Sequence, residues 1–178
     1  MIDNFDSDID SYVDNALICE NGHLINDSMK TFPADNSDYC EECGAKAISK
    51  CPNCNNLIES ITYTKAEHIK CFSRDIDYMT IPAYCKYCGN PYPWTKAKIE
   101  ALEETVDLID ELNEDEKQQL KKAAKDISTN NPKTQVGVLK IKKYLGNVGE
   151  TMRATVQKIF IDIASETAVK LMKQQGMI

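Results

Sequence analysis

The chain has 178 residues, of which 42% are hydrophobic, and its formal net charge is −7. That length allows one sizeable domain or two small ones, and the hydrophobic share is ordinary for a soluble protein. No stretch approaches the roughly 18 consecutive apolar residues of a membrane span, and the acidic balance excludes the class of uniformly basic nucleic-acid-binding proteins.

The chain opens with an acidic segment. Residues 1–14 contain five aspartates, and the first residues have neither the basic nor the apolar part of a secretory signal peptide. We expect residues 1–15 to form a solvated acidic arm. We also expect a cytoplasmic protein, in which cysteine thiols stay reduced.

Four short pairs of metal-ligating residues dominate the region between Cys19 and Cys88. One pair has the spacing C-x3-H and three have C-x2-C, which gives eight ligands, or two closed tetrahedral zinc sites. A catalytic zinc keeps one position open for water, so two full sets of four predict two structural zinc ions per chain. The predicted ligands are Cys19, His23, Cys40, Cys43, Cys51, Cys54, Cys85 and Cys88.

The local sequence supports metal ligation rather than disulfides. A C-x2-C loop holds two thiolates on one side of a turn, and Gly44 and Gly89 directly follow the second cysteine, where a positive φ is needed. We favour sequential pairing, the first pair with the second and the third with the fourth, because each half then closes a local β-hairpin. Pairing of the second with the third, and interleaved pairing, both remain open.

The segments around these pairs predict two zinc ribbons in series. We expect strands at 16–18 and 81–84 leading into knuckles, turns within 24–39, and the strands of a second ribbon within 55–84. His68 and Cys71 are spaced to touch one metal, but they are surplus to a complete set of eight. We therefore interpret them as a surface histidine and a small buried hydrophobic residue.

Sequence motifs of enzymes are missing. Zinc deaminases need H-x-E and P-C-x-x-C, whereas Leu24 and Ile25 follow His23, and Lys50 precedes Cys51. The chain also lacks a P-loop, G-x-S-x-G and H-E-x-x-H. This favours a protein that is not an enzyme.

From Thr95 the periodicity is helical, and no cysteine follows Cys88. We predict a bundle of about four helices, with the second capped by Asn113 and Glu116 and the third beginning at Pro132 and ending at Gly146. The fourth and longest opens with Asn147 and Glu150 as a cap and runs past residue 171. Its apolar stripe leaves two residues outside, Ile161 and Val169. They indicate either a contact with another subunit or two stray surface residues.

Charge is divided unevenly along the chain. Residues 1–94 hold 7 Lys/Arg against 15 Asp/Glu, and residues 95–178 hold 14 against 13. A lysine cluster between 117 and 143 follows an acidic stretch between 100 and 116, and two antiparallel helices with these charges would neutralise each other. The alternative is that the lysine cluster binds nucleic acid. The cluster consists of Lys117, Lys121, Lys122, Lys125, Lys133, Lys140, Lys142 and Lys143.

The order of these motifs resembles an uncharacterised bacterial family known only as a domain of unknown function. The matching segments are 18–25, 39–46, 50–54, 82–95 and 161–168, so that the resemblance covers nearly the whole chain apart from the acidic arm. It implies a bacterial cytosolic protein with a zinc-ribbon half and a helical half. It implies no known activity.

Together these patterns predict an α+β fold with an acidic arm (1–15), a small-β double zinc-ribbon domain (16–93) and a helical domain (94–178). The expected function is non-enzymatic: two structural Zn²⁺ ions support a protein-interaction surface, and the helices mediate self-association or docking to a protein partner. Binding of nucleic acid through residues 117–143 is the alternative.

Overall fold

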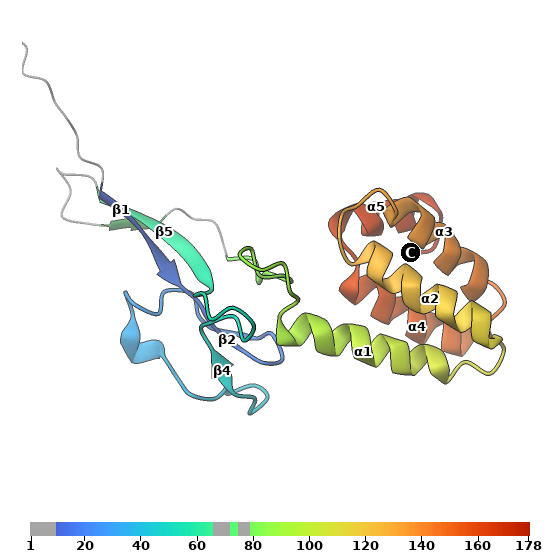
Figure 1. The fold of residues 1–178 in the computed structure, drawn as a ribbon, viewed down its shortest axis with the longest axis horizontal. Helices are drawn as coiled ribbons and strands as arrows, with labels where there is room; N and C mark the ends of the chain where they lie inside the picture. Colours follow the sequence, from blue (N-terminus) through green and yellow to red (C-terminus); the bar gives the residue numbers. More distant parts are fainter. Residues whose placement is uncertain (1–9, 66–71, 75–78) are drawn as a thin grey trace, which may run out of the picture. The chain divides into compact units, whose positions relative to one another are not determined.

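The computed structural model describes residues 10–65, 72–74 and 79–178, and its strands precede its helices along the chain (Figure 1). It contains two compact units, Met1–Trp94 and Thr95–Ile178. Small antiparallel sheets lie in the first unit and helices in the second. The predicted α+β fold class is therefore confirmed.

The first sheet has the strand order β1-β5-β6 and consists of β1 (Asp10–Asn15), β5 (Glu59–Lys65) and β6 (Phe72–Arg74). All pairings are antiparallel, and Tyr12 faces Tyr63, with their rings stacked at 5.3 Å between centroids. The prediction of a solvated arm is wrong for residues 10–15, because they pair with β5 along their length. Residues 1–9 lie outside the described residues.

Asp14 explains why an acidic segment becomes a strand. Its side chain is fully buried, and its carboxylate accepts hydrogen bonds from the backbone N–H groups of Lys30 (2.9 Å) and Thr31 (3.0 Å) and from the Thr31 hydroxyl (2.7 Å). A buried carboxylate is tolerated only with such partners. These hydrogen bonds connect β1 to the turn that follows β3.

We expect Asp14→Ala to destabilise the first unit by about 3 kcal/mol, because four donors, the three above and the Asn15 N–H, lose a charged acceptor. Burial acts to raise the pKa of Asp14, but the hydrogen bonds from Thr31 and Lys30 outweigh it, so the folded-state pKa is lowered. The ionised Asp14 carboxylate thus stabilises the folded first unit at pH values above its unfolded-state pKa. This stabilisation is lost as the pH falls through the folded-state pKa. Urea unfolding of the variant and of Asp38→Ala, an exposed control, checks this. Equal stability of the two variants at pH 7 contradicts it.

The second sheet has the order β3-β2-β4 and consists of β2 (Leu17–Cys19), β3 (Leu24–Asn26) and β4 (Ala47–Ile48), with a short 3-10 helix, η1 (Pro33–Asp35), between β3 and β4. The strand expected at 81–84 is wrong, since only an isolated bridge joins Tyr84 to Pro91. Pro82 has no N–H for a ladder, and its carbonyl accepts instead from the Trp94 indole at 2.9 Å.

A small apolar cluster forms the centre of the first unit. Trp94 stacks on Tyr92 with 4.7 Å between ring centroids, and the turn between β2 and β3 lies against the same indole. Gly22 in that turn has φ +89°, and a Cβ there would lie 2.9 Å from the Trp94 Cβ, so only glycine fits. The buried members are Ala16, Ile18, Cys51, Ile58, Cys85, Tyr92 and Trp94.

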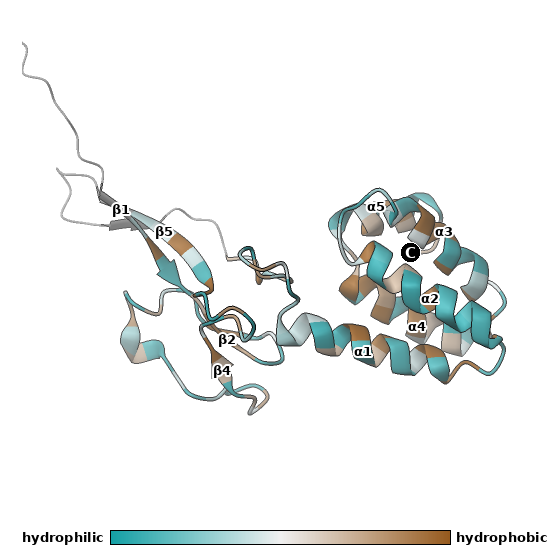
Figure 2. Ribbon diagram, in the orientation of Figure 1, coloured by the Kyte–Doolittle hydropathy of each residue, from teal (hydrophilic) through white to brown (hydrophobic). Residues whose placement is uncertain are grey.

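Five helices follow in the described part of the chain: α1 (Pro93–Asp107), α2 (Glu114–Ile127), α3 (Thr134–Leu145), α4 (Glu150–Ile163) and α5 (Glu166–Gln174). Hydrophobic and hydrophilic residues alternate along each helix in Figure 2, as amphipathic helices require. The apolar faces make one core, with Leu102, Leu120, Ile141 and Phe160 fully buried. None of these helices is long and apolar enough to cross a membrane.

Several helix boundaries test the capping predictions. Asn113 and Glu116 form the predicted capping box on α2, and Gly146 ends α3 as expected. The expected start of α3 at Pro132 is wrong by two residues, because the Asn131 side chain accepts from the Lys133 N–H (2.7 Å) and keeps 131–133 in a turn. The predicted cap at Asn147 is also wrong, since Gly149 precedes α4 and makes no side-chain cap.

The long fourth helix is interrupted. Ala164 leaves the helical region with ψ 139°, and Ser165 caps α5 by accepting from the Ala168 N–H. The Ser165 N–H in turn donates to the Ile127 carbonyl at the end of α2 (2.9 Å). Ile161, predicted outside the apolar stripe, packs half-buried against the core. Whether its exposed part contacts another subunit stays a prediction.

The lysine cluster is partly neutralised within the second unit. Lys121 lies 2.5 Å from Asp107, Lys125 lies 2.9 Å from Glu103, and the Lys117 ammonium donates to the Asp107 carbonyl. These contacts join α2 to α1. The expected neutralisation between the acidic and the basic helix is thus present for Lys121 and Lys125.

Candidate metal centres

The three C-x2-C loops have one backbone design. In each, the N–H of the first cysteine donates to the carbonyl five residues later, and the N–H of the residue after the second cysteine donates back to the first cysteine at 2.8 Å. That residue has a positive φ in all three loops: Gly44 at 70°, Asn55 at 60° and Gly89 at 71°. The prediction for the glycines is confirmed. Asn55 was missed, although asparagine is the residue that best replaces glycine there.

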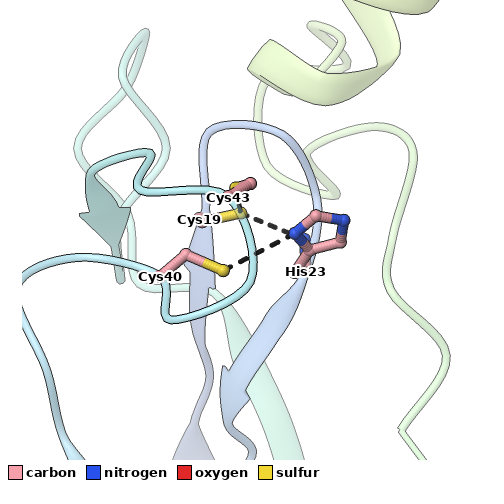
Figure 3. A group of neighbouring side chains, drawn as sticks. All are labelled: Cys19, His23, Cys40 and Cys43. Carbon is pink, nitrogen blue, oxygen red and sulfur yellow. Dashed lines mark hydrogen bonds between the residues drawn. The ribbon is translucent and has the colours of Figure 1, made fainter.

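The first candidate centre joins the β2–β3 turn to the loop at Cys40 (Figure 3). Cys19 ends β2, and a tight turn, closed by a bond from the Cys19 N–H to the His23 carbonyl (2.9 Å), returns His23 to the same place. The Sγ atoms of Cys19 and Cys43 lie 3.7 Å apart, and His23 Nδ1 lies 3.5 Å from the Cys40 Sγ. The ring thus offers Nδ1, the nitrogen nearer its backbone.

The second candidate centre brings the third and fourth pairs together. The Sγ atoms of Cys51 and Cys88 lie 3.8 Å apart, and those of Cys54 and Cys85 lie 3.6 Å apart. In each centre all four ligand atoms lie within 4.8 Å of one another. The grouping is the sequential one, so the alternative pairings are excluded.

These distances fit a single tetrahedral ion. Zn–S bonds of about 2.3 Å and a Zn–N bond of about 2.0 Å place two sulfurs about 3.8 Å apart and a sulfur and a nitrogen about 3.5 Å apart. The four distances above match those edges. A disulfide would instead need about 2.05 Å. Either group could therefore hold a metal ion between its ligands.

Nearby N–H groups prepare several thiols for metal binding. The Ala45 N–H, with the Asn21 side chain at 3.4 Å, lowers the pKa of Cys43 to about 6. Burial acts to raise the pKa of Cys85, but bonds from the N–H groups of Cys88 and Tyr87 outweigh it and hold that pKa at about 6. Metals bind thiolates, so such donors favour a loaded site.

The two centres differ in their exposure to solvent. In the first, Cys43 is exposed and 40% of the His23 side chain is accessible. In the second, Cys51 and Cys85 are each 2% exposed and belong to the apolar cluster around Trp94. Burial accordingly raises the pKa of Cys51 to about 11. Cys19 and Cys40 of the first centre are buried as well, so the difference between the centres lies in Cys43, whereas Cys54 and Cys88 of the second are only partly exposed.

The structure brings all eight predicted ligands into these two groups, and they are the only such groups among residues 10–65, 72–74 and 79–178. His68 and Cys71, predicted to be bystanders, lie outside the described residues. Their roles stay a prediction.

Comparison with known proteins places the chain in a family. The model of the family described as "Uncharacterized protein conserved in bacteria (DUF2321)" matches residues 12–172. The chain belongs to this family. The match spans both candidate centres and the helices from α1 to α4, and it ends within α5. No curated protein and no solved structure is significantly similar to the chain.

Proposed function

We propose that the chain is a non-enzymatic zinc-binding protein whose two structural zinc ions support a protein-interaction surface. The observation that carries this proposal is that each group brings four sulfur or nitrogen ligand atoms within 4.8 Å of one another, with two distances in each group that match the edges of a tetrahedral zinc site. A zinc ion held by four protein ligands has no position for a substrate. Its contribution is to cross-link the chain, with residues 16–93 as a double zinc-ribbon domain.

Exposed aromatic side chains beside the metal ligands support an interaction role. Tyr39 precedes Cys40 and is 63% exposed, and Tyr87 lies between Cys85 and Cys88 and is 54% exposed. Tyrosine is enriched in protein interfaces, where its large ring loses little conformational entropy. The proposed partners are other proteins in the cytoplasm, where the thiols stay reduced. The helical domain, proposed as 94–178, would serve self-association or docking.

Metal analysis tests the proposal. Protein purified without chelator is expected to contain two zinc ions per chain by elemental analysis, because each ligand set is complete and the small ribbon cores cannot fold on apolar burial alone. Four thiolates can also hold iron, so iron is measured in the same sample. A content of one zinc, no metal, or iron in place of zinc contradicts the proposal.

A further inference from the structure

A groove runs beside the first candidate centre. It has a volume of about 420 Å³ and lies between β3 and the segment from η1 to the Cys40 loop. Cys40 is buried and belongs to its lining, so that a candidate metal ligand forms part of the groove. Its lining consists of Leu24, Ile25, Ala34, Asp35, Asn36, Ser37, Cys40, Glu41 and Glu42.

The wall opposite β3 is anchored by hydrogen bonds. The amide of Asn26, only 7% exposed, donates to the Phe32 carbonyl at 2.9 Å and to the Asn36 side chain at 2.8 Å. The Asn36 amide donates in turn to the Met29 carbonyl at 3.1 Å. The groove is therefore already formed, and a ligand need not order this segment when it binds.

The strand on the other side of the groove is an edge strand. In the described part of the chain β3 pairs only with β2, and Leu24 is 37% exposed. An edge strand offers backbone N–H and carbonyl groups to a further extended segment, and pockets beside it receive alternate side chains. An extended peptide is thus the shape that this groove fits.

The acidic side chains along the groove favour a basic peptide. Asp35, Glu41 and Glu42 are all exposed along the groove, and no described lysine or arginine forms an ion pair with them. His23 Nδ1 lies 3.8 Å from Glu42, but this nitrogen is a candidate metal ligand and is not protonated when it holds a metal. A zinc ion with three thiolates and one neutral histidine adds a further net negative charge. Basic side chains complement this groove, whereas the phosphates of a nucleic acid would be repelled.

We propose that this groove binds an extended, basic segment of a partner protein, with the segment's backbone along β3, its lysine or arginine side chains at Asp35, Glu41 and Glu42, and an apolar side chain over Leu24. The inference deepens the proposed function, on which it rests, since the first centre shapes the groove. It names the partner by its chemistry: alternating basic and apolar residues in an extended chain.

The binding test uses the full-length, metal-loaded protein and the synthetic peptide Gly-Lys-Leu-Lys-Val-Lys-Gly. We expect saturable binding by calorimetry that weakens as salt rises. We also expect changes in amide NMR signals confined to 24–26 and 34–42. The same peptide N-methylated at alternate residues should bind more weakly, because it loses donors to β3. A version with glutamate in place of lysine should not bind.

Two matched triple variants locate the contact. Asp35→Asn with Glu41→Gln and Glu42→Gln should weaken binding about tenfold, because three exposed ion pairs are lost. Asp110→Asn with Glu104→Gln and Asp162→Asn removes the same charge from exposed positions in the second unit and should leave affinity unchanged. Zinc content is measured in every protein.

The outcomes separate the two proposals. Three results would contradict peptide binding in the groove: equal weakening by both triple variants, no saturable binding, or NMR changes outside 24–26 and 34–42. The proposed function would still stand if the protein contained two zinc ions. A wild-type protein that contains fewer than two zinc ions when purified without chelator would instead contradict the proposed function itself. Preference for a duplex or single-stranded nucleic acid over the basic peptide would also refute the groove.

Discussion

Cys85→Ser is expected to remove about one zinc ion per chain and to unfold the apolar cluster of the first unit. Cys85 is 2% exposed and packs with Ile58, Tyr92 and Trp94, so the loss of metal also opens the centre of the unit. A structural zinc contributes about 10 kcal/mol or more, which matches or exceeds the net stability of most small domains. Elemental analysis and amide NMR spectra measure the two effects.

The matched control is Cys71→Ser, which also removes one thiol. Because Cys71 is surplus to the two sets of four, we expect this variant to keep two zinc ions and an unchanged spectrum of the first unit. Loss of one zinc from the Cys71 variant, with retention of both by the Cys85 variant, would show that the ligand set is wrong.

A chelator is expected to remove metal in two steps, from the first centre before the second. Cys43 of the first centre is exposed to solvent, whereas the most accessible ligands of the second centre, Cys54 and Cys88, are only partly exposed. Complete removal should unfold the first unit and leave the helical signal of the second, because the helical core consists of residues between 102 and 172. A zinc indicator dye and circular dichroism follow the two processes.

The control for this titration is the variant Cys43→Ser, which should begin with one zinc and release it in a single step at the slower rate. Release of both metals from the wild-type protein at one rate contradicts the assigned difference in exposure. Loss of the helices together with the metals contradicts independent folding of the second unit.

The candidate centres were largely predictable because ligand spacing is local. A C-x2-C loop requires a positive φ at the residue after its second cysteine, so Gly44 and Gly89 at that position predicted the loop conformation. The use of Nδ1 by His23 was not predictable, because it depends on how tightly the β2–β3 turn returns the ring to Cys19. Nor was the difference in exposure, which depends on packing far along the sequence from the ligands.

The helical half shows where local signals fail. The capping box at Asn113 was predictable because its two partners are three residues apart. The break at Ser165 was not, because the bond that holds it runs to Ile127, far away in the sequence. Similarly, the local sequence places Asp14 in an acidic arm, because the residues that donate to its carboxylate, Lys30 and Thr31, lie far along the chain.

The position of Trp94 gives the first unit an optical property of its own. It is the only tryptophan in the chain, and its ring stacks on Tyr92 and lies against Gly22 in the turn of the first centre. The same ring belongs to the cluster that contains Cys51 and Cys85 of the second. Fluorescence excited at the red edge of indole absorption therefore reports on the cluster beside both centres, without a dye and without tryptophan emission from residues 95–178.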